Sequence, residues 1–203
     1  RITRNSIALT VEKGAHLLFG MGLMVGVARL LGEGELGSYA YAISLTALFV
    51  PILDMGLNNR VIVAVASGGT EASEAASEAV ALKLALAPAA LVAMGVVAWF
   101  SDKPAEVLVV VLLVGGSTVA MSLGDAVNAL FKGLQKPLYS ALLVGGLNGL
   151  LFGTGIGAMA AGLGRAGVGA CYFLCRIGYL GAGLGLAGRV APDLRPSFRP
   201  GIR

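Results

Sequence analysis

The chain of 203 residues is 57% hydrophobic and only 13% charged, and it contains 31 glycines. A soluble domain carries about 25% charged residues and about 7% glycine, so these values and the mean hydropathy of +0.85 exclude most soluble folds and indicate a membrane protein. The net charge of +4 does not indicate nucleic-acid binding, and we expect no nucleic-acid partner, because the basic residues do not cluster with interleaved aromatic ones.

Apolar runs bounded by polar clusters predict an all-α bundle of six transmembrane helices. The predicted helices cover residues 6–31, 37–66, 79–100, 106–131, 138–163 and 167–188. They form one lobe over residues 1–188, and the basic, proline-rich segment 189–203 is expected to be a cytoplasmic linker. The second helix is long for one span, which predicts a tilt or a kink at Pro51. The polar stretch 68–78 is expected to lead into the third helix.

Lysine and arginine are unevenly distributed between the two sides of the predicted bundle. One side carries Arg1, Arg4, Lys132, Lys136, Arg189, Arg195, Arg199 and Arg203, and the other carries Arg29, Lys103 and Arg165. Cytoplasmic loops of membrane proteins are the richer in basic residues, so both ends of this segment are expected in the cytoplasm. An even number of helices agrees with this orientation.

The fifth predicted helix carries small residues at every fourth position. They are Gly145, Gly149, Gly153, Gly157 and Ala161. Such a stripe lets a neighbouring helix approach closely in a bilayer, which predicts a static packing seam. The alternative is a smooth surface along which a helix slides during transport.

Charged residues inside the spans are costly and normally face a partner or a cavity. Arg176 lies near the middle of the sixth helix, where it indicates either a buried ion pair or an anion-binding cavity. Asp125 shares a polar face of the fourth helix with Thr118, Ser122 and Lys132. It is interpreted as a partner of Arg176 or Lys83, or as a proton or sodium site. Lys83, one turn inside the third helix, is expected to extend its amine to the interface.

Two further polar pairs have the i, i+4 spacing that places both members on one helix face. Glu12 and His16 form the first pair, for which a packing histidine is the main interpretation and a proton relay the alternative. Asp54 and Asn58 form the second pair, in the cytoplasmic half of the second helix, where partial hydration lowers the cost of the charge.

Motifs for soluble-type chemistry are not visible in the sequence. It contains no phosphate-binding glycine loop with Lys-Ser/Thr, no HExxH and no GxSxG. We therefore expect transport or a structural role rather than enzymatic activity, with no cofactor and no metal.

The first two predicted helices carry a longer pattern. It runs from VARLLG (27–32) through LGSYAYAISL (36–45) to DMGLN (54–58). This pattern resembles the start of the polysaccharide-exporting flippases, the Wzx-type O-antigen translocases of the multidrug/oligosaccharidyl-lipid/polysaccharide superfamily. The six-span layout with a cytoplasmic N-terminus is similar to the N-terminal lobe of that MATE-like fold.

The resemblance implies a transporter of twelve or fourteen helices in two lobes around a central cavity. Such a protein flips an undecaprenyl-pyrophosphate-linked oligosaccharide across the bacterial inner membrane, with proton or sodium coupling. Its partners would be that lipid-linked substrate, a second lobe of the same polypeptide and the polysaccharide polymerase machinery. Because the chain lacks an initial methionine and ends in a basic tail, it is expected to be a fragment that holds half of the cavity.

The resemblance also implies a cationic cavity for the anionic head group. The candidate substrate-binding residues are Arg176, Lys13, Arg60, Lys83, Arg29, Asn58, Asn128 and Asn148, and the candidate ion-coupling residues are Asp125, Asp54, Glu12 and His16. A cation-coupled multidrug exporter of the same superfamily is the alternative function, for which acidic residues would dominate the cavity. A membrane scaffold without transport activity is the third.

Overall fold

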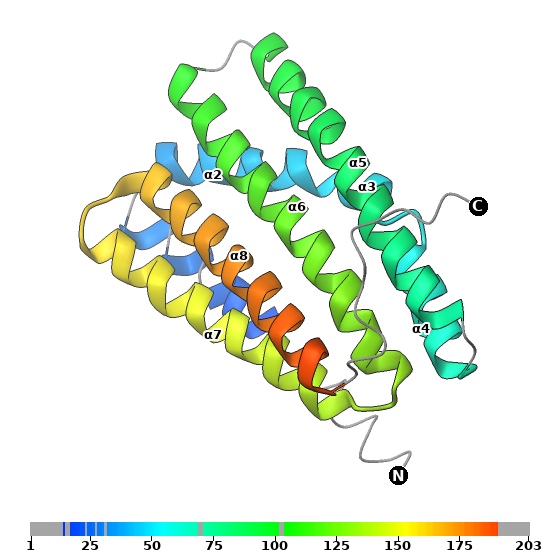
Figure 1. Cartoon of the computed structure of the whole chain (residues 1–203). Coiled ribbons are helices and arrows are strands. Elements are labelled where there is room, and N and C mark those ends of the chain that lie inside the picture. Colours follow the sequence, from blue (N-terminus) through cyan, green and yellow to red (C-terminus); the bar gives the residue numbers. More distant parts are fainter. Residues whose placement is uncertain are drawn as a thin grey trace.

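The computed structural model describes residues 14, 17–22, 24–26, 28–30, 32–68, 71–101 and 104–190, and these ranges contain no strand. The labelled helices are α2 (Glu33–Ala47), α3 (Val50–Asp54), α4 (Leu57–Ala66), α5 (Glu71–Phe100), α6 (Ala105–Gly133), α7 (Pro137–Ala160) and α8 (Gly164–Val190). The described residues between 17 and 30 are helical as well. The predicted all-α bundle is therefore confirmed (Figure 1).

Five helical stretches among the described residues are long and apolar enough to cross a membrane, and the first of them runs through both α2 and α3. They are Leu36–Asp54, Ala72–Phe100, Ala105–Gly133, Pro137–Ala160 and Ala166–Val190. Large apolar side chains such as Val92, Trp99 and Leu150 are exposed on their outer sides, where a soluble protein would place polar residues. The chain is a multi-pass membrane protein.

The centre of the bundle is α6, which packs against α2, α4, α5, α7 and α8. More than half of its most apolar window, 56%, is buried, against 22–39% for the other spans. Glycines allow these close contacts, because a Cβ at Gly124 would collide with the Tyr179 ring on α8, and one at Gly133 would lie 2.6 Å from Cβ of Val65 on α4. Figure 1 shows α6 between α5 and α8, with α7 on the far side of α8.

The second predicted helix is broken more severely than expected. Instead of one bent helix over 37–66, the chain forms α2, α3 and α4, and Pro51 lies in the first turn of α3, where proline fits without a kink. The sharp break follows at Met55 and Gly56, whose φ angles are +43° and +77°. It places Asp54 at the end of α3 and Asn58 in the first turn of α4.

The third predicted helix begins earlier than expected. The polar lead-in forms the first turns of α5, so a single helix of 30 residues begins at Glu71 and continues through Pro88. Alanine and glutamate are strong helix formers, which explains why the polar stretch continues the span rather than forming a loop.

The glycine stripe of α7 is not a packing seam within the described part of the chain. A Cβ added at Gly145, Gly149, Gly153 or Gly157 would meet no atom within 4 Å. The stripe therefore lies in the open, whereas Gly124 of α6 makes the tightest described contact of a glycine with another helix.

Candidate functional site

A cavity of about 580 Å³ lies between α3, α4, α6 and α7, near the end of the bundle where α4 and α6 terminate. Its polar lining consists of Asp54, Asn58, Asn59, Asp125, Asn128 and Lys132. Four of the residues proposed from the sequence thus meet in one place, although they lie far apart in the chain. Amide and carboxylate groups bind hydroxyl-rich ligands well, because each can donate or accept more than one hydrogen bond.

Lys83 on α5 lies behind one wall of this cavity, where it holds two of the lining side chains. Its Nζ donates to Asp54 Oδ1 at 3.1 Å, to Asn58 Oδ1 at 2.9 Å and to the backbone carbonyl of Ser122 at 2.9 Å. The expectation that Lys83 extends to the interface is wrong, since the side chain is only 1% exposed. Three acceptors satisfy all three N–H groups of the ammonium, so the buried position is tolerated.

Asp125 faces the same cavity from α6. Its Oδ1 accepts a hydrogen bond of 2.9 Å from the Tyr179 hydroxyl on α8. Within the described residues no ion pair joins it to Arg176 or Lys83, although both cations and Lys132 act on it through space. The direct partner of Asp125 is therefore a tyrosine rather than either base.

The charges around the cavity are of both signs. Asp54, Asp125 and Lys132 line it, and Lys83 lies directly behind Asp54. Among the described residues that line this cavity, two are acidic and one is basic. No three His, Cys, Asp or Glu side chains come together as a metal site in the part of the chain that the structure describes.

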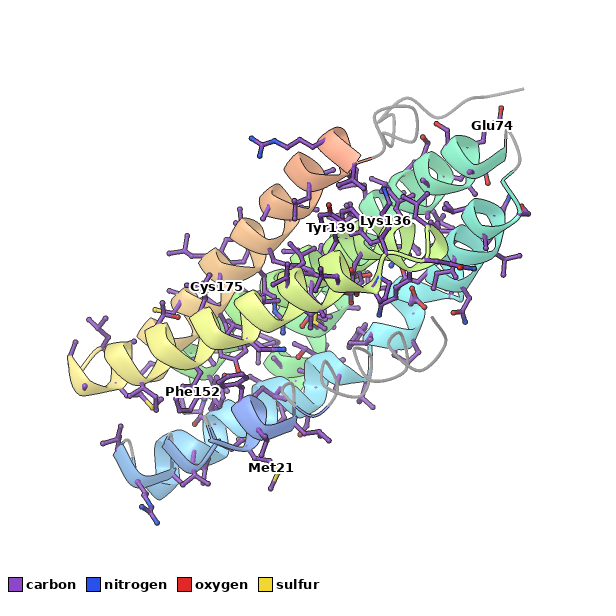
Figure 2. The ribbon with its side chains drawn as sticks, turned by 90° about the horizontal axis from the view of Figure 1, so that it is seen from below. Met21, Glu74, Lys136, Tyr139, Phe152 and Cys175 are labelled. Atoms are coloured by element: carbon purple, nitrogen blue, oxygen red, sulfur yellow. The ribbon has the colours of Figure 1, made fainter. Side chains whose placement is uncertain are left out.

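Arg176 lies elsewhere, beside a smaller cavity of about 40 Å³. Asn148, Phe152 and Tyr172 also line this cavity, and Phe152 projects from α7 toward the N-terminal helical residues, with its ring centroid 5.7 Å from that of Phe19 (Figure 2). Arg176 is buried, with 8% of its surface exposed. Over the described ranges its guanidinium makes no hydrogen bond and no ion pair, and it interacts with Asp125 only through space. Such a buried cation favours an anion that enters the cavity.

The remaining candidates are dispersed. Arg60 forms an ion pair of 2.8 Å with Glu78, and both side chains are more than half exposed. Arg29 is exposed on the N-terminal helical segment. Lys13, Glu12 and His16 lie outside the described residues. The structure thus groups Asn58 and Asn128 at the larger cavity, and Asn148 and Arg176 at the smaller one.

Four contributors to the site were not singled out as site residues from the sequence, and Asn59, next to Asn58, is the first of them. Tyr179 lies three residues after Arg176 on one face of α8, and this spacing is a usable signal. Lys132 was recognised only as part of the polar face of Asp125. The Ser122 carbonyl carries no sequence signal, since every carbonyl in a helix interior accepts from its own helix and only tertiary packing decides which of them receives a second donor.

The comparisons with known proteins give one positive result. The model of the family described as "Polysaccharide biosynthesis protein" matches residues 2–180. The chain belongs to this polysaccharide biosynthesis family. No curated protein and no solved structure matches it significantly. The matched range includes both cavities, so the polar residues described above belong to the part of the chain that the family shares.

Proposed function

We propose that this chain is the N-terminal lobe of a flippase that moves an undecaprenyl-pyrophosphate-linked oligosaccharide across the bacterial inner membrane. The proposal rests mainly on the position of Arg176. Its guanidinium is buried beside a cavity and has no hydrogen bond or ion pair in the described ranges. A guanidinium offers a planar set of donors that matches phosphate oxygens. The family match supports a role in polysaccharide biosynthesis, and a lipid-linked pyrophosphate is the anion that we propose for this site.

The larger cavity supplies the complementary chemistry for the sugar. Asn58, Asn59 and Asn128 provide amide groups, while Asp125 and Lys132 provide charged acceptors and donors. Its position at the ends of α4 and α6 corresponds to the side that the basic loops assign to the cytoplasm. The substrate would enter there, and a second lobe would close the path for alternating access.

Asp125 is the best candidate for coupling to a proton or to sodium. It faces the cavity and lies within the field of Arg176, Lys83 and Lys132. Protonation or cation binding at this carboxylate would change the charge that the substrate meets. Asp54 is less suited to this role, because its oxygen already accepts from Lys83.

Replacement of Arg176 in the complete polypeptide tests the proposal. A charge-assisted hydrogen bond contributes about 1.5–3 kcal/mol, so Arg176→Gln should lower export of the polysaccharide unit about ten- to a hundredfold. The assay is complementation of a strain that lacks the exporter, with membrane insertion confirmed by immunoblot. Arg189→Gln is the matched control, because Arg189 is exposed in the last turn of α8. Normal export by Arg176→Gln would remove this residue from the substrate path.

One observation favours a cation-coupled multidrug exporter as the second candidate. The lining of the larger cavity contains two carboxylates and one ammonium. In that case Asp125→Asn should abolish resistance to cationic drugs in the complete protein, and Arg176→Gln should leave it unchanged. Loss of folding on exchanging Asp54 and Lys83, with no separable transport defect, would instead favour a scaffold.

A further inference from the structure

The ammonium of Lys83 occupies an oxygen-lined site at the junction of α3, α4, α5 and α6. Its ligands are a carboxylate, an amide oxygen and a main-chain carbonyl, all at 2.9–3.1 Å. Carboxylates and neutral oxygens are the donors that hard cations such as the alkali-metal ions take in proteins. An ammonium group has nearly the size of K⁺, so these distances also suit that ion.

The broken helix strengthens the site for any cation. Asp54 is the last residue of α3, and the break at Met55 and Gly56 ends the hydrogen-bonded ladder there. The C-terminal end of a helix carries a partial negative charge, which adds to the charge of the Asp54 carboxylate. Discontinuous helices in membranes bind ions in this way, through the groups that the break exposes.

The site borders buried protein on the side of α5 and the open cavity on the other side. Lys83 enters from α5 and is 1% exposed, whereas the Asp54 side chain is 31% exposed. Asp54 and Asn58 both line the 580 Å³ cavity, which Lys83 does not. A cation in the cavity would therefore meet two of the three oxygen groups that hold the ammonium.

We propose that Asp54, Asn58 and the Ser122 carbonyl form a monovalent-cation site whose resident cation is the Lys83 ammonium. A free cation of similar size, K⁺ or ammonium, takes the same place when the lysine is removed. In the wild-type chain the site is filled without an ion from solution. This proposal does not rest on the proposed function, because it concerns the occupancy of the site rather than the transported molecule.

The test is a rescue of Lys83→Ala by cations, measured as the thermal unfolding midpoint of the purified chain in detergent. The salts are KCl, ammonium chloride, methylammonium chloride and choline chloride at one ionic strength. In choline, Lys83→Ala should unfold on the order of 10 °C below wild type, because Asp54 loses its counter-charge. K⁺, ammonium and methylammonium should each restore at least half of this loss. The wild-type midpoint should be the same in all four salts.

Two control variants separate cation binding from a general salt effect. Lys83→Met fills the space with an apolar side chain and should show no rescue. Lys83→Ala combined with Asp54→Asn removes the charged ligand and should respond equally to all four salts.

Equal midpoints of Lys83→Ala in all four salts would overturn the proposal, and so would a failure of this variant to fold in any of them, K⁺ included. Either result would leave the proposal of flippase activity intact, since the assay does not involve transport.

Discussion

Arg176 and Lys83 are both buried cations in a membrane bundle, but they differ in their hydrogen bonding. Lys83 has a complete set of acceptors, whereas Arg176 has no hydrogen bond or ion pair within the described residues. An ammonium with three partners stabilises one arrangement of helices. This contrast in hydrogen bonding is the basis on which we propose Arg176, and not Lys83, as the base that binds substrate.

The ion pair of Lys83 with Asp54 should show coupling in a double-mutant cycle. Lys83→Met leaves a carboxylate without its counter-charge, and Asp54→Asn leaves the ammonium with neutral acceptors only. Each single variant should lose about 1–3 kcal/mol of unfolding free energy. The double variant should be at least about 1 kcal/mol more stable than the sum of the two losses predicts. Strictly additive losses in chemical denaturation would contradict the ion pair.

The hydrogen bond from Tyr179 to Asp125 should also contribute measurably. Tyr179→Phe removes the hydroxyl and keeps the ring that packs against Gly124, so it should lower the unfolding free energy by about 1–3 kcal/mol. Tyr139→Phe is the control, because it retains the ring stacked on Phe131 and should change stability little. Equal effects of the two variants would contradict the assignment.

At the scale of elements, the glycines of α6 and those of α7 have different roles. A side chain at Gly124 of α6 would collide with Tyr179, whereas one at Gly153 of α7 would meet nothing. Gly124→Ala should therefore cost about 1–3 kcal/mol through overpacking, and Gly153→Ala should be neutral or slightly stabilising through helix propensity. Thermal melts of the two variants decide the matter, and an equal loss at Gly153 would show that this stripe is packed.

The break between α3 and α4 depends on Gly56. At φ +77° a side chain is strained although no atom lies within 4 Å of an added Cβ. Gly56→Ala should cost about 1–2 kcal/mol for conformational reasons alone. Gly34→Ala, at an open position within α2, is the matched control and should not destabilise the chain. A neutral Gly56→Ala would mean that the helix break is not fixed by this backbone conformation.

The sequence predicted most elements and the residue types of the site, but not their partners. Hydropathy located α6, α7 and α8 to within a few residues, because a bilayer fixes the length and polarity of a span. It could not show that Lys83 turns inward to Asp54, since that choice depends on where α3 ends. The spacing of the α7 glycines predicted a packing seam, but spacing alone does not show which helix, if any, packs against them.

At the scale of the whole molecule, α6 is the element on which both proposed sites depend. It carries Asp125, Asn128 and Lys132 into the larger cavity, and its glycines set the approach of α8, which carries Arg176. The exposed side of α7 combines open glycines with exposed leucines such as Leu142 and Leu150, and we propose a second lobe as the neighbour of this mostly apolar face. In this account the lobe holds one part of a substrate path.

The central claim is that the complete protein flips a lipid-linked pyrophosphate oligosaccharide with Arg176 in the path. It is tested most directly in proteoliposomes, by following a fluorescent polyprenyl-pyrophosphate oligosaccharide from one leaflet to the other. We predict rapid movement with the wild-type protein, and movement about ten- to a hundredfold slower with Arg176→Gln but not with Arg189→Gln. Movement no faster than in protein-free vesicles, or equal rates for wild type and Arg176→Gln, would contradict the account.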